Sequence, residues 1–332
     1  MPDSEVTAEM AAAVIVQHGA PPVYRQHPMP RRAAGQALVR VIAAPISPLD
    51  LLCASGTSYF GPPALPYVPG VQGVGSVEVS ERFTPGTRVW FSCDAGMKPG
   101  DGSMAAFCVA YESALLPLPA GVPDDLAAAL GLSAIAAWLG LTWRGQMQPG
   151  EQVLVLGASG AVGQVAVQAA RLLGARRVIA ATRDPGALAS ALDHGADATV
   201  DLKSDDVDAL TQRMAAACDG PLELVIDPIC GPGSQAAMRA LANGGRLVQI
   251  GGAASPATTM ESATVRSKML NILGYTNNAS TNDQKARALT AVLEHAAAGR
   301  ITIDRETLPL ARAGEAWQRQ ASSPHHKLIL TP

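Results

Sequence analysis

Residues 151–174, with the sequence EQVLVLGASGAVGQVAVQAARLLG, decide how this chain folds. The apolar run 153–156 is short and rich in valine, and it predicts a strand that is buried on both faces, as in a parallel sheet. Small residues follow at 158–163. Beyond them, apolar residues recur at helical spacing up to Gly174, which ends the helix. The stretch therefore predicts a strand, a glycine turn and a helix.

A strand, a glycine turn and a helix in this order are what the diphosphate of a dinucleotide requires. Small residues let the backbone approach the phosphates, and the free N–H groups at the start of the helix point at them. The match to G-x-G-x-x-G is imperfect because Ala158 replaces the first glycine, and an ordinary tight turn remains the alternative. The strand before the turn and the helix after it favour a dinucleotide site.

The composition is that of a globular protein large enough for two domains, with 332 residues of which 48% are hydrophobic and 16% charged. The net charge of −3 and the lack of a basic cluster in the sequence give no support for nucleic-acid binding. The five cysteines are scattered and have neither zinc-finger nor redox spacing, so we expect reduced, buried thiols in a cytoplasmic protein.

One segment resembles a membrane span, because residues 126–143 contain no charged side chain. It is rich in alanine and glycine and barely reaches the length that a bilayer requires, so we expect a buried helix and no membrane association. The N-terminal residues include Asp3, Glu5 and Glu9, without a basic start followed by an apolar run, so no signal peptide is predicted.

The first hundred residues differ from the rest of the chain in their pattern of apolar, proline and glycine residues. Short apolar segments alternate there with proline and glycine, which predicts a mostly antiparallel, turn-rich β domain. The expected strands are 12–16, 37–43, 73–79, 87–91 and 104–110. Proline is dense between Pro21 and Pro69, and we expect extended loops in that region.

Strands and helices alternate after the glycine turn. The expected strands are 177–182, 198–200, 222–227, 246–251 and 269–275, and the expected helices are 186–194, 207–218 and 234–241. This alternation predicts an α/β fold with a doubly wound parallel sheet. A long helix is expected at 283–298, followed by two small strands and a helix.

The order of these parts resembles the medium-chain dehydrogenase/reductase superfamily over almost the whole chain. The matching segments are 46–50 (ISPLD), 68–75 (VPGVQGVG), 86–89 (GTRV), 102–105 (GSMA), the turn 158–163, 244–248 (GGRLV) and 327–330 (KLIL). The resemblance implies a GroES-like, β-rich catalytic domain at 1–122 and 277–332 and a Rossmann dinucleotide-binding domain at 123–276. It also implies a homodimer that pairs the sixth strands, around 270–275.

Zinc is the main branch point within this family. Zinc alcohol dehydrogenases have a cysteine where Ser47 stands and a His-Glu pair where Val71 and Gln72 stand. A hydroxyl, an isopropyl group and an amide leave no thiolate or imidazole for the metal, and the cysteine-rich structural zinc lobe is missing too. The sequence therefore predicts no metal site.

The expected chemistry follows from that difference. Without a Lewis acid to stabilise an alkoxide, oxidation of an unactivated alcohol is difficult, whereas reduction of a conjugated acceptor is easier. The resemblance to the quinone oxidoreductase and enoyl reductase branch implies a zinc-independent, NADPH-dependent oxidoreductase acting on a small conjugated carbonyl or quinone. Two alternatives stay open: a reductase or dehydrogenase of one specialised-metabolite intermediate, and a catalytically silent cofactor-binding protein of the crystallin type.

Thr182 and Arg183 bear on the choice of cofactor, because they stand where an NAD enzyme carries Asp or Glu for the ribose. A hydroxyl and a guanidinium suit the 2′-phosphate of NADPH. The alternative is that Arg183 is a solvated loop residue and Asp184 binds the ribose. The candidate cofactor-binding residues are Ser47, Ala158, Ser159, Gly160, Ala161, Val162, Gly163, Thr182, Arg183, Asp227, Ile250, Gly251, Gly252, Tyr275 and Lys327.

The candidate catalytic residues are Tyr59 and Ser47. The Tyr59 phenol could hydrogen-bond the substrate carbonyl or protonate the enolate, or its ring packs on the neighbouring prolines. Ser47 is expected to contact the nicotinamide ribose or the substrate. Ala136 takes the place of a threonine that is common near the nicotinamide in this family, so one donor is absent. Asp50 is expected to be a structural acid.

Overall fold

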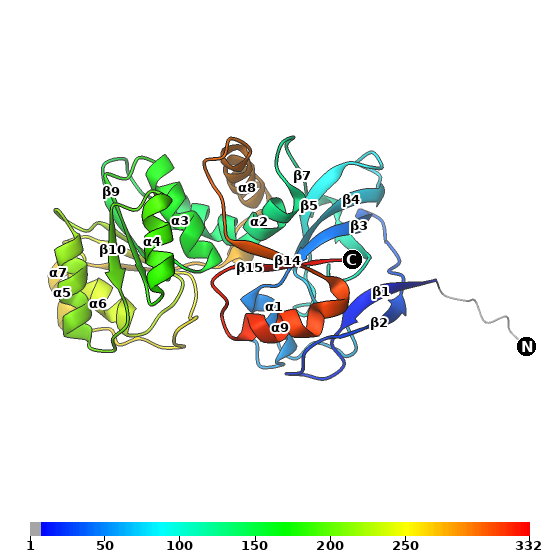
Figure 1. Ribbon diagram of the computed structural model, residues 1–332, viewed down its shortest axis with the longest axis horizontal. Coiled ribbons are helices and arrows are strands. Elements are labelled where there is room, and N and C mark those ends of the chain that lie inside the picture. The colour runs from blue at the N-terminus through cyan, green and yellow to red at the C-terminus, as the bar shows by residue number, and fades with distance from the viewer. Residues whose placement is uncertain (1–7) are drawn as a thin grey trace, which may run out of the picture. The chain divides into compact units, whose positions relative to one another are not determined.

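The structure, a computed structural model, describes residues 8–332 and comprises two compact units (Figure 1). Unit 1 contains the described residues up to Gly131 together with Asp304–Pro332, and unit 2 contains Leu132–Ile303. These limits differ from the predicted domain boundaries after residues 122 and 276.

The difference has a structural reason in helix α8 (Asn282–Ala297), which was expected in the β domain and lies in unit 2. Its His295 ring lies 5.9 Å from the ring of Trp138, which also belongs to unit 2. After the helix, Thr302 forms backbone hydrogen bonds to the Gln168 amide, at 2.7 and 3.0 Å. These contacts join the segment after β13 (Asn271–Gly274) to the second unit.

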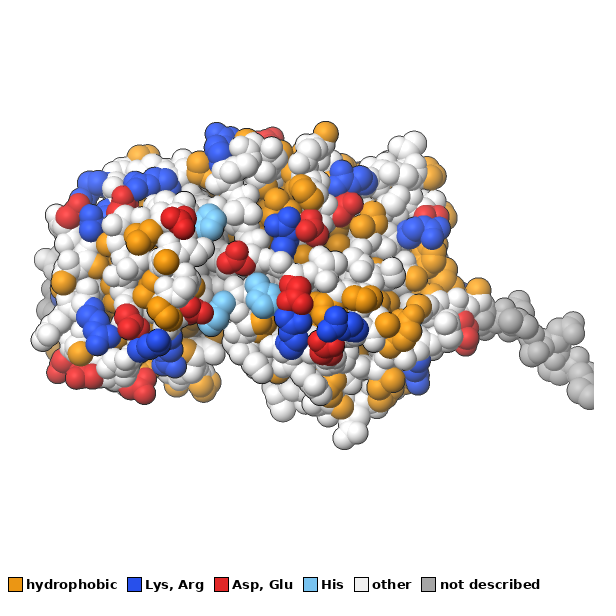
Figure 2. Space-filling model, in the orientation of Figure 1, with side chains coloured by type: hydrophobic (Ala, Val, Ile, Leu, Met, Phe, Trp, Pro, Cys, Tyr) orange, Lys and Arg blue, Asp and Glu red, His pale blue; other side chains and the backbone are white. Residues whose placement is uncertain are grey.

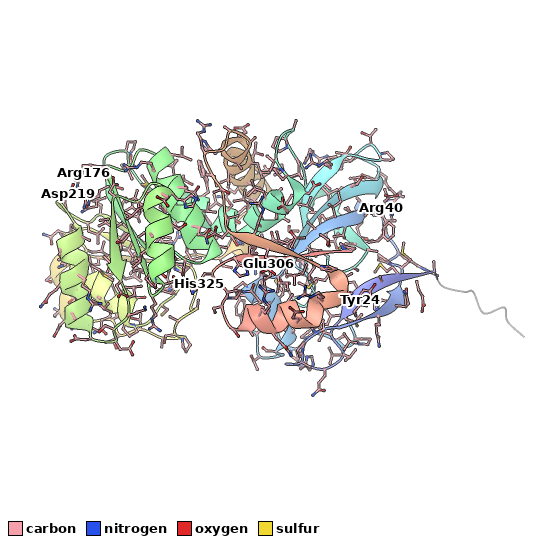
Figure 3. All side chains as sticks on the ribbon, viewed as in Figure 1. Tyr24, Arg40, Arg176, Asp219, Glu306 and His325 are labelled. Carbon is pink, nitrogen blue, oxygen red and sulfur yellow. The ribbon has the colours of Figure 1, made fainter. Side chains whose placement is uncertain are left out.

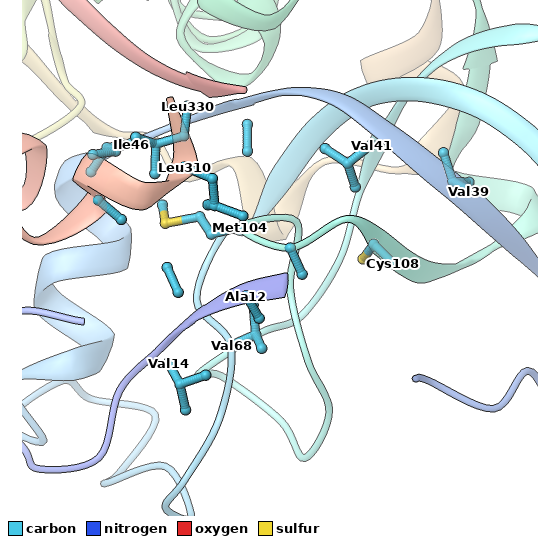
Figure 4. Packing of buried hydrophobic residues seen from close by; sticks show 14 of the residues in the cluster. Ala12, Val14, Val39, Val41, Ile46, Val68, Met104, Cys108, Leu310 and Leu330 are labelled. Atoms are coloured by element: carbon cyan, nitrogen blue, oxygen red, sulfur yellow. The ribbon is translucent and has the colours of Figure 1, made fainter. Parts of the chain in front are cut away.

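Unit 1 is built mostly on antiparallel strands, as predicted, and β14 and β15 pair in parallel. Its elements are β1 (Glu9–Val14), β2 (Val23–Pro28), β3 (Gln36–Pro45), α1 (Pro48–Ala54), β4 (Gln72–Val79), β5 (Arg88–Ser92), β6 (Phe107–Tyr111), η1 (Glu112–Ala114), β7 (Leu115–Pro117), β14 (Arg305–Pro309), η4 (Leu310–Arg312), α9 (Ala313–Ala321) and β15 (Lys327–Thr331). β1 pairs with β2, and the seven-stranded sheet has the order β14-β15-β3-β4-β5-β7, with β6 on β3. Figure 4 shows Ile46, Met104, Leu310 and Leu330 meeting in the core of this unit.

Unit 2 is a six-stranded parallel sheet with helices between its strands. Its other elements are η2 (Gly140–Arg144), β8 (Gln152–Leu156), α3 (Ala161–Leu172), β9 (Arg177–Thr182), α4 (Pro185–Asp193), β10 (Ala198–Asp201), α5 (Val207–Ala217), β11 (Leu224–Asp227), α6 (Pro232–Ala240), β12 (Arg246–Gln249), α7 (Ser262–Lys268) and η3 (Asn277–Ala279). The strand order is β10-β9-β8-β11-β12-β13, so the order reverses between β8 and β11. The predicted doubly wound sheet is confirmed, and ligands of such sheets bind at the carboxyl ends beside that reversal.

Helix α2 (Asp124–Leu139) is interrupted at Gly131, whose φ of 27° and ψ of −126° are not helical. A Cβ at Gly131 would lie 2.0 Å from the Gln72 amide oxygen and 2.7 Å from the Trp90 indole nitrogen, so only glycine fits there. Among the described residues, one helical stretch, Asp124–Arg144, has the length and apolar composition of a membrane span, and 72% of its apolar window is buried inside the protein. The same measures fit a core helix.

Several local predictions were wrong. The region between Pro21 and Pro69 contains β2 and α1 rather than only extended loops. The predicted strand 104–110 begins later, at Phe107, and neither β7 nor α7 was predicted. β7 has three residues and α7 buries none of its side chains, so neither has the apolar pattern by which a sequence indicates an element.

Charged side chains of both signs are interspersed over the face shown in Figure 2. Several are paired. In unit 2, Arg176 precedes β9 and forms an ion pair with Asp219, which follows α5 (Figure 3). Arg246, at the start of β12, pairs with Glu151. Both pairs lie at the amino ends of the parallel strands, opposite the carboxyl ends at which the candidate site residues stand.

Candidate functional site

The turn after β8 is closely packed at two of its glycines. Gly157 has a φ of 61°, and a Cβ there would lie 2.4 Å from Cγ2 of Ile229. A Cβ at Gly163 would lie 2.2 Å from the Gly157 carbonyl oxygen and 2.7 Å from Cα of Ala158. Both positions therefore require glycine, because backbone atoms or a side chain at the end of β11 occupy the space.

The space beside Gly160 is open, in contrast. Gly160 precedes α3 in an extended conformation, and a Cβ there would meet only the Gly157 oxygen, at 3.5 Å. No side chain caps the start of α3. The backbone N–H groups of Ala161, Val162 and Gly163 thus lie at a helix N-terminus without a side-chain acceptor, beside room for a ligand. This arrangement fits the diphosphate of a dinucleotide.

Three of the predicted residues hold this turn together. The N–H of Ala158 donates to the carbonyl of Ala181 in β9, at 3.0 Å. The hydroxyl of Thr182 donates to that of Ser159, at 2.9 Å, and both side chains are buried. Thr182 therefore ties the end of β9 to the turn, and its hydroxyl proton is engaged inside the protein rather than offered to a ligand.

Arg183 and Asp184 follow Thr182 in the sequence, and their side chains make different contacts. The Asp184 carboxylate accepts hydrogen bonds from the N–H groups of Gly186 and Ala187, at 2.7 and 3.1 Å, and so caps α4. The Arg183 guanidinium lies 3.4 Å from Asp205, and these two side chains are 60% and 83% exposed. At the end of β9 the structure thus offers an exposed cation and an acid that is engaged in capping a helix.

Asp227, at the end of β11, is fully buried. Its carboxylate accepts hydrogen bonds from the N–H groups of Ile229 and Cys230, at 3.0 and 2.9 Å, and from the Ser234 hydroxyl. Burial raises the pKa of this carboxyl, and the three donors oppose the rise. Asp227 was predicted to bind cofactor, but its two oxygens face the loop that follows β11, so the geometry supports a role in shaping that loop.

The predicted residues after β12 lie close to the same loop. The Ile250 N–H donates to the Asp227 carbonyl, at 2.8 Å. A Cβ at Gly251 would lie 2.9 Å from the carbonyl oxygen of Pro228, and one at Gly252 would lie 2.8 Å from that of Ser255. The ends of β8, β9, β11 and β12 therefore gather the predicted segments of unit 2 at one edge of the sheet.

Tyr275, which was predicted to bind the cofactor, follows β13 and makes contacts within unit 2. Its hydroxyl donates to the Asn277 side chain, at 2.6 Å, and its ring packs edge-on against Trp143, with centroids 6.2 Å apart. Burial raises the pKa of the Tyr275 phenol. Asn277 in turn donates to the carbonyl of Leu132 at 3.1 Å, so Tyr275 fastens the chain after β13 to the start of unit 2.

In unit 1, Ser47 and Asp50 form a buried hydrogen-bonded group at the start of α1. The Ser47 hydroxyl and N–H donate to one Asp50 oxygen, at 2.6 and 2.8 Å. The Asp50 N–H donates back to the Ser47 Oγ at 3.3 Å, which completes a capping box. The other oxygen accepts from the N–H groups of Gly70 and Val71, at 3.1 and 2.9 Å. The structure thus places Asp50 as the structural acid that was predicted, with the Ser47 proton directed to it.

Lys327, the first residue of β15, is only 4% exposed and lies near this group, since the N–H of Ile46 donates to the carbonyl of Leu328 at 2.9 Å. Burial lowers the pKa of the Lys327 ammonium to about 8, and the Asp50 charge opposes the change. Burial also raises the pKa of Asp50, against its hydrogen bonds and the attraction of Lys327. The topology therefore brings together the predicted residues Ser47 and Lys327, which are far apart in sequence, around one buried carboxylate.

Tyr59 stands apart from that group. Its side chain is 76% exposed, and its ring lies 4.2 Å from the ring of Phe60. The ring contact in the structure is thus to Phe60, and the phenol is accessible to solvent. A mostly exposed phenol after α1 can donate a hydrogen bond to a ligand without breaking one inside the protein.

The donors at the zinc-ligand positions do not suit the metal. The Ser47 proton is directed to Asp50, Val71 has no donor atom, and the Gln72 amide oxygen accepts from the Trp90 indole at 3.1 Å. Over residues 8–332, no group of three or more His, Cys, Asp and Glu side chains is placed to hold a metal ion. Zinc prefers thiolate and imidazole ligands, so these residues do not fit a zinc site.

Sequence reasoning missed the role of Gly157. Counted from Gly157, the glycines at 157, 160 and 163 have a regular spacing of three, and this spacing was the available signal. The contact of Gly157 with Ile229 had no such signal, because it joins the ends of two strands that neighbour each other only in the folded sheet.

Two family models match the chain. The alcohol dehydrogenase GroES-like domain matches residues 33–120, and the family described as zinc-binding dehydrogenase matches residues 161–294. The first match lies in unit 1 and the second in unit 2.

The chain is also similar to proteins of known sequence or structure. It is 31% identical over 221 residues to a quinone oxidoreductase-like protein 2 homolog of Nematostella vectensis, covering 65% of this chain and 58% of that protein. It is 31% identical over 246 residues to an alcohol dehydrogenase of Rhizobium meliloti, covering 66% and 71%. The quinone oxidoreductase of Thermus thermophilus, solved also as its complex with NADPH, superposes with a TM-score of 0.80 at 29% identity, covering 97% of this chain and all of that one. The chain spans little more than half of the Nematostella protein and only 13% of another, longer relative.

A GroES-like β-rich domain and a Rossmann-type doubly wound sheet define the class of two-domain dehydrogenases and reductases, and the predicted fold is confirmed. Within that class, the chain belongs to the medium-chain dehydrogenase/reductase superfamily, in its quinone oxidoreductase-like branch.

Proposed function

We propose that this chain is a zinc-independent, NADPH-dependent oxidoreductase that transfers hydride to a conjugated carbonyl or a quinone. The observation that carries this proposal is the open, uncapped start of α3 beside Gly160, which suits a dinucleotide diphosphate. The donor set at Ser47, Val71 and Gln72, which does not suit zinc, supports the zinc-independent branch. The quinone oxidoreductases among the relatives support the class of acceptor.

In this proposal, different groups of the chain bind the cofactor and donate a hydrogen bond to the acceptor. The N–H groups of Ala161, Val162 and Gly163 bind the diphosphate, and the Arg183 guanidinium pairs with the 2′-phosphate. When bound, the nicotinamide supplies the hydride. Ser47 directs its proton to Asp50 and offers only an oxygen acceptor, so the exposed Tyr59 phenol is the candidate donor to the acceptor's oxygen.

The test is NADPH oxidation against a panel of quinones, enals and enones, with and without a chelator. We expect turnover of at least one acceptor class at a rate that the chelator does not change. Loss of activity with the chelator and its return with zinc would contradict the zinc-independent mechanism. NADPH binding without turnover of any acceptor would favour the silent cofactor-binding alternative.

Arg183→Ala is expected to weaken NADPH binding by about 1–3 kcal/mol and to leave NADH binding almost unchanged, because only NADPH carries the 2′-phosphate. Binding of both cofactors is measured by calorimetry. Asp205→Ala is the matched control: it removes the acid 3.4 Å from the guanidinium, and NADPH affinity should stay the same or increase. Equal losses for the two cofactors in Arg183→Ala would exclude the phosphate role.

Tyr59→Phe is expected to lower kcat for enone reduction by about 10- to 100-fold with little change in NADPH affinity, because the ring remains and only the donor is lost. The Phe60 contact does not depend on the hydroxyl, so thermal stability should not change. Steady-state kinetics and a melting curve measure both effects. An unchanged kcat would leave Tyr59 as a packing residue.

We also propose a homodimer through β13. In the described part of the sheet, β13 pairs with β12 alone. Met269, just before β13, is 68% exposed, and Ile272, within β13, is 40% exposed. Ile272→Lys is expected to yield a monomer in light scattering, since charge on an edge strand opposes pairing. Leu192→Lys, on α4, is the control at an apolar side chain of similar exposure and should leave the assembly state unchanged.

A further inference from the structure

Two hydrogen bonds in series join the end of β9 to the turn after β8. The N–H of Asp184 donates to the Thr182 hydroxyl oxygen over a long 3.4 Å, and the Thr182 hydroxyl donates to the Ser159 hydroxyl oxygen at 2.9 Å. Thr182 is 3% exposed and Ser159 is 8% exposed, so water has little access to either side chain. The series therefore runs from β9 toward the turn, and the Ser159 hydroxyl is its last member.

The Ser159 hydroxyl keeps one proton that the protein does not use. A hydroxyl has a single proton to donate and two lone pairs that accept. The Thr182 proton occupies one lone pair of Ser159, so the Ser159 proton cannot point back at Thr182 and needs another acceptor. Over residues 8–332, no carbonyl and no side chain accepts it. A buried donor without an acceptor is unfavourable, so this proton is available to a ligand.

The backbone around Ser159 is fixed on both sides of the next peptide bond. The Ser159 carbonyl accepts from the Gln164 side-chain amide at 2.9 Å, and the N–H of Gly160 donates to the Gly157 carbonyl at 3.0 Å. Gly160 is also the residue beside the open, uncapped start of α3. Ser159 thus directly precedes the space in which the cofactor diphosphate is proposed to lie.

We propose that Ser159 donates its hydroxyl proton to the cofactor diphosphate, and that Thr182 is a positioning residue that keeps this proton directed away from β9. The inference rests on the proposed function, because the diphosphate is the acceptor that Ser159 lacks in the protein. Phosphate oxygens are charged acceptors, and hydrogen bonds to charged groups are stronger than those between neutral groups. Thr182 therefore serves the diphosphate and not the ribose.

This assignment gives two neighbouring residues different effects on cofactor choice. Thr182 is buried and acts through Ser159 on the diphosphate, which NADPH and NADH share. The Arg183 side chain is 60% exposed and is proposed to bind the 2′-phosphate, which NADH lacks. Loss of the Thr182 hydroxyl should therefore weaken the binding of both cofactors alike. An acid in Thr182→Asp would lie against Ser159 and take its proton, so this variant should not gain NADH affinity.

The experiment measures NADPH and NADH binding to the full-length protein by calorimetry. Ser159→Ala should raise both Kd values by about 10-fold or more, the loss expected for a hydrogen bond to a charged group. Thr182→Val removes the positioning hydroxyl and should raise both by a smaller factor, whereas Thr182→Ser keeps the hydroxyl and should retain most of the affinity. The double variant Ser159→Ala/Thr182→Val should bind no more weakly than Ser159→Ala, because Thr182 acts through Ser159.

Two controls locate the effect. The nucleotide 2′-AMP has a 2′-phosphate but no diphosphate, so its Kd should be the same for Ser159→Ala and the wild type. Thr211→Val removes another threonine hydroxyl of unit 2, which donates to the Val207 carbonyl within α5 at 2.7 Å. This variant should leave the Kd values of both cofactors unchanged. A melting curve of each variant identifies any loss of fold, and Ser159→Ala still tests the donor if Thr182→Val does not fold.

The outcomes separate this inference from the proposed function. Wild-type NADPH affinity in Ser159→Ala would overturn the role of Ser159 while leaving the cofactor site in place. A further loss when Thr182→Val is added to Ser159→Ala would show that Thr182 does not act through Ser159, and a gain of NADH affinity in Thr182→Asp would assign position 182 to the ribose. A wild-type protein that binds neither cofactor would refute the proposed function, and this inference with it.

Discussion

Gly160→Val is expected to weaken NADPH binding, raising its Kd by about 100-fold or more, while the protein stays folded. A hundredfold loss corresponds to about 3 kcal/mol. A valine side chain would occupy the open space beside the start of α3, where the diphosphate is proposed to lie. The backbone at Gly160 has a φ of −80° and a ψ of 163°, which every residue adopts, so the substitution itself introduces no backbone strain.

Gly163→Ala is the matched comparison, three residues further along the same turn. Its Cβ would lie 2.2 Å from the Gly157 oxygen, and that atom belongs to the backbone and has little freedom to move. We expect a loss of about 1–3 kcal/mol in the free energy of unfolding, together with weaker cofactor binding. The two variants thus separate space kept for a ligand from space filled by the protein.

Calorimetric titration with NADPH and urea unfolding are the measurements for this pair. Wild-type NADPH affinity in Gly160→Val would refute the proposed diphosphate site. Unfolding of Gly160→Val at the same urea concentration as Gly163→Ala would show instead that its loss of binding is a loss of fold.

Asp50→Ala is expected to cost about 3–5 kcal/mol in the free energy of unfolding. The substitution leaves the Ser47 hydroxyl and three backbone N–H groups without their acceptor inside the protein. It also leaves the buried Lys327 ammonium without its neighbouring negative charge. Unpaired buried donors and an unpaired buried charge are each strongly unfavourable, so the effects act in the same direction.

The charge on Lys327 makes a separate, pH-dependent prediction. Its pKa in the folded protein is about 8, against an ordinary value of 10.5. The unfolded chain therefore binds more protons between these two values, and stability should rise with pH across that window. Lys327→Met should flatten this rise, and it should also recover part of the loss in the double variant with Asp50→Ala.

Urea unfolding at several pH values tests both statements. Asp94→Ala is the control: its carboxylate pairs with Lys98 at 2.8 Å but is 44% exposed, so the change should stay within about 1 kcal/mol. An Asp50→Ala loss as small as that of the control would mean that the buried hydrogen bonds contribute little.

The local elements of unit 2 were predictable because their signals lie within a few residues. The buried valine-rich run before the turn and the capping acids such as Asp184 and Asp206 indicate strand ends and helix starts directly. Helix α1 was missed although its signal is also local. Ser47, Pro48 and Asp50 form a capping box with proline at the first helical position, and the density of proline around them concealed it.

The predicted site residues show where local reasoning ends. Thr182 and Asp227 stand at the expected strand ends, yet their polar atoms face Ser159 and Ser234 inside the protein. The sequence position at a strand end does not specify which way a side chain turns. Among the predicted positions, Arg183 presents an exposed cation. The turn around Gly160 presents an open helix start.

The sequence by itself determined the strand, turn and helix order, the alternation that makes a doubly wound sheet, and the unsuitability of Ser47, Val71 and Gln72 for zinc. These follow from residue types and from contacts within a few positions. Only the tertiary structure decided that Lys327 lies near Asp50 and that α8 belongs to unit 2. The physical reason is that such contacts depend on strand pairing and packing between distant segments, on which neighbouring residues carry no information.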